Sequence, residues 1–184
     1  TKMTRSDVLR GQSWRLSLNG YVDQVEDFIS RDRAHGQSGV LLNDNAFIWR
    51  NVDARLAGAE AEAAVNLTRN LSTKLALYYR WGENTADSRA LYGIDPLEAN
   101  WLVDWQDTMG EIGSWNAGFK LRAVAGQHRL DADPSAGSGF DADNRGGFGL
   151  FDLYAGVQFH DTIGLRVGVD NVVALGFGLF AARR

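Results

Sequence analysis

The chain has 184 residues, of which 45% are hydrophobic and 23% are charged, so it is long enough for one ordinary domain and too apolar for a disordered chain. A formal net charge of -4 argues against a general nucleic-acid binder, which normally carries a basic patch. Cysteine is absent, which excludes disulfides, thiolate metal sites and a cysteine nucleophile from this chain. Glycine is abundant at 21 residues and proline occurs twice, a combination that suits long strands with tight turns.

Apolar and polar residues alternate through most of the chain. In chain order, the alternating runs cover residues 14–22, 57–67, 71–81, 97–105, 115–125, 151–159 and 163–169. A period of two is typical of a β-strand whose two faces differ chemically. We therefore predict an all-β fold with about seven antiparallel strands.

The second run has a competing interpretation. Residues 53–65, "DARLAGAEAEAAV", are rich in Ala and Glu, both good helix formers. Glu60 and Glu62 share a face of a strand, whereas on a helix they would lie on opposing sides. This favours a strand, with a helix as the alternative.

The connections between the runs alternate in length. Residues 68–72, 107–111 and 160–162 form short connections, whereas residues 34–45, 84–95 and 130–146 form long ones rich in Gly, Asp, Asn and Ser. In an up-and-down meander, alternate turns lie at the same end of the sheet. A sheet with short turns at one end and long loops at the other is typical of outer-membrane barrels, which have short periplasmic turns and long extracellular loops.

Strand length and aromatic positions favour a membrane barrel over a soluble sandwich. Several runs exceed the roughly five or six residues usual in globular strands and match the roughly 9 to 11 that cross a membrane. Aromatic residues lie beside both kinds of connection, as in the two girdles of a membrane barrel. The residues predicted to face lipid or form a girdle are Trp14, Trp81, Trp101, Trp105, Trp115, Phe151 and Phe159.

The opposite parity carries charges of both signs, which suits a hydrated lumen. The predicted lumen-facing residues are Lys74, Arg80, Glu98, Asp104, Lys120, Arg122, Asp152, Arg166 and Asp170, and Tyr154 shares their side. A soluble β-sandwich binding module would expose the same side chains to solvent, so it remains an alternative, as does a passive porin-like barrel. Unpaired strand edges are intolerable in lipid. We therefore expect residues 1–184 to be part of a larger transmembrane barrel, without its final strand.

Several segments resemble a known family. The segments "YVDQVEDFI", "RNVDARLAGAEAEAAVNL", "LYGIDPLEANWLVDW", "LRAVAGQHRLD", "GFGLFDLYAGVQF" and "LRVGVDNV" are similar, in order and spacing, to C-terminal barrel strands of TonB-dependent outer-membrane receptors. Within that family, the sequences of these segments are most similar to those of the copper-receptor branch. The resemblance implies a 22-stranded barrel in the bacterial outer membrane, surrounded by lipid and filled by a plug domain that lies outside this chain. It also implies import of a metal or metal chelate, driven by the TonB complex acting through that plug.

Beyond this resemblance, the sequence shows no clear set of catalytic or metal-binding residues. Copper prefers Met, His or Cys ligands, and the two methionines are Met3 and Met109. His35 and His128, at or near long connections, are the metal-ligand candidates, although a solvated loop histidine is the favoured interpretation. No combination of acid, base and nucleophile emerges. We therefore expect a non-enzymatic protein with no resident cofactor, copper or a metal chelate being the transported substrate.

Overall fold

The computed structural model describes residues 1–9, 12–33, 47–130, 146–160 and 162–177. Its elements are β1 (Lys2–Leu9), β2 (Gln12–Arg33), β3 (Phe47–Asn66), β4 (Leu71–Asn84), β5 (Arg89–Ala90), β6 (Glu98–Thr108), the 3-10 helix η1 (Gly110–Ile112), β7 (Gly113–Val124), β8 (Gly147–Phe159) and β9 (Ile163–Phe177). The strands form one nine-stranded sheet in the order β1-β2-β3-β4-β6-β7-β8-β9, and β5 pairs with β4. Every pair is antiparallel, so the predicted all-β, up-and-down arrangement is confirmed.

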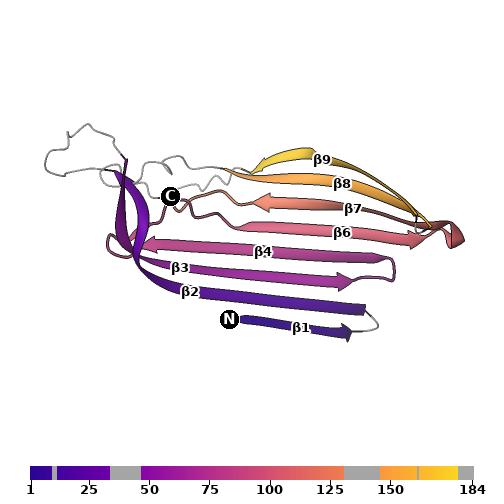
Figure 1. Ribbon diagram of the computed structural model, residues 1–184, viewed down its shortest axis with the longest axis horizontal. Helices are drawn as coiled ribbons and strands as arrows, with labels where there is room; N and C mark the ends of the chain where they lie inside the picture. The colour runs from indigo at the N-terminus through magenta and orange to yellow at the C-terminus, as the bar shows by residue number, and fades with distance from the viewer. Residues whose placement is uncertain (10–11, 34–46, 131–145, 161, 178–184) are drawn as a thin grey trace, which may run out of the picture.

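The sheet is a single open layer. Figure 1 shows the strands side by side, with β1 and β9 at opposite edges. Within the described residues, β1 pairs only with β2 and β9 pairs only with β8, so neither outer edge has a partner. An open edge presents unpaired N–H and C=O groups, which a barrel wall satisfies by pairing with further strands.

Two rows of paired residues define the faces of the sheet. Leu75, Trp101, Leu121, Phe151 and Val173 are register partners on successive strands, and the side on which they lie is the apolar face. The neighbouring positions on each strand point to the opposite side, because side chains alternate along a strand. That side, which carries Ser72, Asp104, Gly118, Tyr154 and Gly168 in another register row, is the polar face.

The sheet has almost no hydrophobic core. Among the described residues, the buried hydrophobic side chains are Val52, Ala54, Ala76 and Leu91. Large apolar side chains are instead exposed, for example Trp105 at 52% and Val167 at 62%. The sandwich alternative requires a second sheet packed against this one, and the described residues form no second sheet. None of the described residues belongs to a helix that is long and apolar enough to cross a membrane.

The short connections lie at one end of the sheet, as predicted. β3 and β4 are joined by a turn closed by a hydrogen bond from the Leu67 amide to the Leu71 carbonyl at 2.8 Å. η1 occupies the turn between β6 and β7, and β8 ends directly before the predicted connection at 160–162. Figure 1 shows these turns gathered at the right of the view, opposite the long ends of β2 and β3. The predicted long connection at 34–45 lies outside the described residues, as does most of the one at 130–146.

The strand count and several bounds differ from the prediction. The sheet has nine strands rather than about seven, because β1 and β5 add to it. The predicted connection at 84–95 contains the last residue of β4 and the whole of β5. The segment after Val169 continues β9 to Phe177, across an irregularity opposite Asp152. Residues 53–65 lie within β3, so the strand interpretation is right and the helix interpretation is wrong.

β2 and β3 are much longer than a membrane crossing requires, with 22 and 20 residues. Their register shifts between Val25 and Phe28, and Asp27 has a positive φ of 56°. This β-bulge ends the simple alternation of the sequence, because an inserted residue changes which parity faces which side. The pair beyond the bulge forms a ribbon at the long-loop end (Figure 1).

Candidate functional site

The register places eight of the nine residues predicted to line the lumen on the polar face, and Asp170 lies in the irregularity of β9 without a register partner. On β4 this face carries Lys74 and Arg80, and the neighbouring strands continue it. The other predicted residues that the register places on this side are Glu98, Asp104, Lys120, Arg122, Asp152 and Arg166. The seven predicted lipid-facing or girdle aromatics lie on the apolar face. The two sets are thus separated by the sheet, while the assignment of the faces to lumen and lipid stays a prediction.

A compact polar cluster lies in the middle of the polar face. The Tyr154 hydroxyl donates to a carboxylate oxygen of Asp104 at 2.6 Å, and the side-chain amide of Asn116 donates to the same oxygen at 3.2 Å. Lys120 Nζ lies 5.8 Å from the centroid of the Tyr154 ring. Gly118 makes this arrangement possible, because a Cβ there would lie 2.5 Å from the tyrosine oxygen. The cluster ties three strands together through side chains on one side.

Ion pairs connect further strands across this face. Arg122 forms a two-point contact with Glu98, at 3.0 Å from Nε and 2.8 Å from Nη2. Glu62 lies between Lys74 at 2.9 Å and Arg15 at 3.6 Å. Exposed pairs of this kind contribute about 0–1 kcal/mol each. Their main effect is therefore to balance charge along the face rather than to stabilise the sheet strongly.

Other predicted lumen residues make different contacts. Arg80 Nη1 lies 2.8 Å from a carboxylate oxygen of Asp95. Asp152 accepts a hydrogen bond from the Asn171 amide at 2.8 Å, at the irregularity in β9. Arg166 and Asp170 lie exposed on β9. The structure thus brings these residues to one side without gathering them into one centre.

A groove of about 920 Å³ lies at the short-turn end, where polar-face residues contribute to its lining. The residues that line it are Arg69, Asn70, Gln106, Asp107, Thr108, Ser114, Trp115, Asn116, Gly156, Val157, Gln158, Gly164, Leu165 and Arg166. Among the polar side chains of this lining, amides and hydroxyls predominate, and charged groups of both signs are also present. Such a lining can solvate ions or hydrogen-bond a polar partner, and it offers no acid, base and nucleophile arranged for catalysis.

The apolar face carries its aromatic side chains in two groups. Trp105 and Trp115 lie beside the short turns with ring centroids 6.4 Å apart. Nearer the middle of the strands, the Phe119 ring lies between Trp101 at 5.2 Å and Phe151 at 5.3 Å. Aromatic pairs at such distances add about 0.5–1.5 kcal/mol beyond their buried area. Phe119 was not predicted as a member of this group, although its parity matches.

Trp14 and Phe159 also lie near the short turns, and Trp81 lies toward the long-loop end of β4. Trp81 is therefore the predicted girdle residue at that end of the sheet. Trp101 and Phe151 lie on the apolar face at an intermediate level, and neither marks an end of the sheet.

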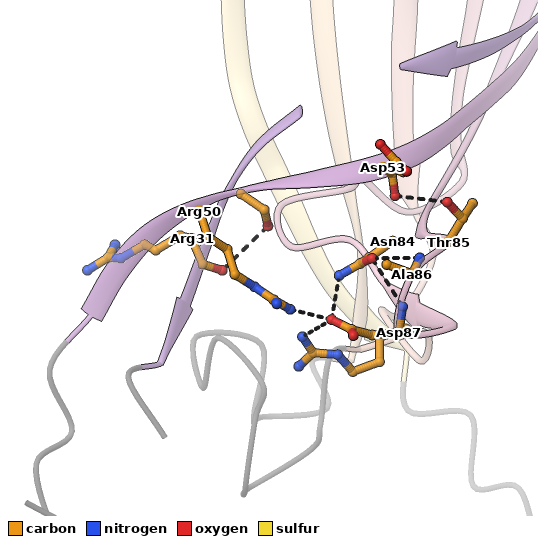
Figure 2. A network of polar contacts seen from close by, with 9 residues as sticks. Arg31, Arg50, Asp53, Asn84, Thr85, Ala86 and Asp87 are labelled. Atoms are coloured by element: carbon orange, nitrogen blue, oxygen red, sulfur yellow. Dashed lines mark hydrogen bonds and ion pairs between the residues drawn. The ribbon is translucent and has the colours of Figure 1, made fainter. Parts of the chain in front are cut away.

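A second polar cluster lies at the long-loop end, between β3 and the turn after β4 (Figure 2). The Asn84 side chain accepts hydrogen bonds from the amides of Ala86 and Asp87 at 3.1 and 3.3 Å, which shapes this turn. Asp87 in turn receives bonds from the side chains of Asn84, Arg50 and Arg89. Thr85 anchors the turn on the Asp53 carbonyl through its amide and its hydroxyl.

The charges and hydrogen bonds of this cluster change the pKa of Asp87. Burial disfavours the ionised carboxyl, but hydrogen bonds and charges from Arg89 and Arg50 outweigh this effect and hold the pKa of Asp87 below its ordinary value of 3.8. The carboxylate therefore stays ionised at neutral pH and holds two arginines from separate strands. Sequence analysis missed this cluster, although "NTAD" carries the Asx-turn signal of an Asn that caps amides two and three residues later.

One of the two candidate histidine ligands lies within the described residues. His128 lies in the segment after β7, and His35 lies outside the described residues. Met3 is exposed on the edge strand β1, whereas Met109 lies in the turn before η1. In the part of the chain that the structure describes, no group of three or more His, Cys, Asp or Glu side chains could hold a metal ion.

Comparisons with known proteins agree with this architecture. The family model described as TonB dependent receptor-like, β-barrel matches residues 5–172. Among solved structures, a chain titled "Copper transporter OprC" matches with a TM-score of 0.72 and 34% sequence identity, over 93% of this chain and 24% of that chain. The present chain thus spans about a quarter of the length of that transporter. No curated protein sequence gives a significant match.

Proposed function

The chain belongs to the TonB-dependent receptor-like β-barrel family, and from this premise we propose that it forms part of the wall of an outer-membrane transporter. The apolar face contacts lipid, and the polar face borders the lumen. The observation that carries this proposal is the separation of apolar and charged side chains across a single-layer sheet that leaves large apolar side chains exposed. An exposed apolar surface of this extent requires a cover, and the lipid bilayer supplies one.

The open edges support the same proposal. A sheet edge in lipid leaves backbone polar groups without partners, at a cost of several kcal/mol for each group. β1 and β9 therefore pair with further strands of the parent protein, which closes the barrel. The groove at the short-turn end then faces the lumen on its periplasmic side, where a polar plug domain makes contact.

The transported substrate in this proposal is copper or a copper chelate. The similarity to a protein titled a copper transporter, at 34% identity over 93% of the present chain, supports this choice. The described residues contain no group of three or more His, Cys, Asp or Glu side chains that could hold a metal ion, so in this proposal the ligands lie outside them. Receptors of this family are transport proteins rather than enzymes. The energy for import reaches the plug through the TonB complex of the inner membrane.

Uptake of copper by cells that express the full-length protein tests this function. Matched strains with and without a functional TonB complex are incubated with copper, and the metal content of washed cells is measured. We expect accumulation only in the TonB-proficient strain that expresses the protein. Equal accumulation in both strains would indicate the passive porin-like alternative. Dependence on TonB with iron or nickel but not with copper would keep the transporter class and overturn the copper assignment.

A further inference from the structure

Two levels of aromatic residues on the apolar face are separated by about the thickness of a hydrocarbon core. Trp105 pairs with Leu71 at the short-turn end of β4, and Trp81 lies toward the opposite end of the same strand. At about 3.4 Å per residue, the path from Leu71 to Trp81 is about 34 Å. A strand tilt of about 40° reduces this path to about 26 Å along the membrane normal, close to the roughly 25 Å apolar band of such barrels. Trp81 therefore marks the membrane interface on the side of the long loops.

An arginine is fixed at this level. The guanidinium carbon of Arg129 lies 4.6 Å from the centroid of the Trp81 ring, and the same guanidinium donates to the Gly82 carbonyl. These two contacts hold the planar group in place but use only part of its five N–H donors. Among the described residues, no carboxylate forms an ion pair with Arg129.

Arg129 lines a crevice of about 220 Å³ beside the end of β4. β6 begins opposite Tyr78, so β4 continues beyond it without that neighbour. The lining of the crevice comes from β4, from the segment before β6 and from the segment after β7, and it includes Tyr79, Arg80, Trp81, Asp95, His128 and Arg129. The single carboxylate in this lining, Asp95, is engaged by Arg80 at 2.8 Å. The crevice therefore combines apolar and aromatic walls with a fixed guanidinium whose charge no described carboxylate balances.

We propose that Arg129, held over Trp81, binds the phosphate of a phosphorylated lipid in the outer leaflet. This inference rests on the proposed function, because it requires the apolar face to lie against lipid. The guanidinium fork matches the oxygen atoms of a phosphate in geometry and in charge. Trp is favoured at the headgroup level of a membrane, which places its ring beside the phosphate layer. The crevice thus selects an anionic headgroup at the point where the barrel leaves the hydrocarbon.

Native mass spectrometry of the full-length protein in detergent tests this site. The protein is titrated with lipid A, which carries phosphates on its sugar headgroup, and with dephosphorylated lipid A. We compare the wild type with Arg129→Gln and with Arg166→Gln, a matched loss of one positive charge from the polar face. We expect Arg129→Gln to weaken lipid A binding about tenfold, since a hydrogen-bonded charge contact contributes about that factor. Arg166→Gln keeps the wild-type affinity, and dephosphorylated lipid A binds wild type and Arg129→Gln equally weakly.

Unchanged lipid A binding by Arg129→Gln would overturn the proposal. Displacement of lipid A by equimolar inorganic phosphate would also overturn it, because the site would then recognise a free anion. If Arg129→Gln fails to fold, as judged by heat-dependent mobility on gels, Arg129→Lys replaces it. The lysine keeps the charge and loses the fork, so we expect intermediate affinity, and affinity equal to the wild type contradicts the assignment. Copper uptake is measured separately in cells, so a failure of the transport function is distinguishable from a failure of this lipid site.

Discussion

At the residue scale, Gly118 sets the packing of the polar face. A Cβ at this position would lie 2.2 Å from the Val103 carbonyl oxygen and 2.5 Å from the Tyr154 hydroxyl. We expect Gly118→Val to displace Tyr154 from Asp104 and to lower the free energy of unfolding of the lipid-reconstituted parent protein by about 1–3 kcal/mol. Urea titration monitored by tryptophan fluorescence measures this difference. Gly168→Ala is the control, since its nearest neighbours lie at 3.5 Å or more, and equal stability of the two variants would contradict the packing argument.

Asp87 makes the stability of the long-loop end depend on pH. Its pKa lies below 3.8 in the folded protein, so the stabilisation that it provides is complete above the ordinary value and is lost as the pH falls through the lowered folded value. We expect amide exchange at Ala86 and Asp87, corrected for intrinsic rates, to accelerate in that acidic range. Hydrogen exchange with mass spectrometry measures this change. Asp87→Asn removes the titrating group, and persistence of the same acid-dependent step in this variant would refute the assignment.

At the scale of the strand, neighbouring residues of β4 face different surroundings. Leu77 lies on the apolar face between the levels of Leu71 and Trp81, and Tyr78 lies on the polar face opposite Glu98. We expect Leu77→Arg to lower the stability of the reconstituted barrel by about 2–4 kcal/mol, the cost of arginine near the bilayer midplane. Tyr78→Arg introduces the same residue beside a carboxylate and should change stability by less than about 1 kcal/mol. Equal losses in equilibrium unfolding of the two variants would show that β4 does not separate lipid from water.

Alternation predicted these strands wherever one face is largely apolar. From Leu71 to Trp81 only Thr73 and Ala76 depart from the period of two, and the strand and its two faces followed directly from it. β1 carried no such signal, because Arg5 and Asp7 occupy positions on its apolar side, where Arg5 lies 5.9 Å from the Trp14 ring. Asp27 broke the pattern in β2 at the bulge, which hid the long extension toward the loops.

The sequence predicted which face of the sheet a side chain occupies better than it predicted which side chains contact one another. Parity brought Asp104, Lys120 and Asp152 to one side and the meander predicted which strands are neighbours, but neither fixed the register between the strands. The bond between Tyr154 and Asp104 spans 50 positions of sequence and depends on the register of β6, β7 and β8. The cluster around Asp87 depends likewise on the position of β3 beside the turn after β4. Such contacts follow from the register of the paired strands, which the alternation of this sequence does not specify.

At the scale of the whole molecule, the described strands form one open sheet. Its apolar face is exposed and both of its edges are open within the described residues. We expect residues 1–184, expressed alone, to aggregate in plain buffer and to remain dispersed only in detergent or lipid. Size-exclusion chromatography with light scattering checks this expectation. A monodisperse, stable monomer in plain buffer would count strongly against a membrane wall.

Spin-label accessibility along β4 tests the central claim most directly, that one face of this sheet contacts lipid and the other contacts water. Single cysteines are placed from Leu71 to Trp81, in a segment that contains no cysteine of its own, and are labelled with a nitroxide in the reconstituted full-length protein. The collision rate with oxygen, which concentrates in lipid, is compared with that of a water-soluble nickel complex. We expect oxygen accessibility to peak at Leu75, Leu77 and Tyr79, with the nickel complex favouring Lys74, Tyr78 and Arg80. Profiles without a period of two, or with the parities exchanged, would contradict the assignment of the faces.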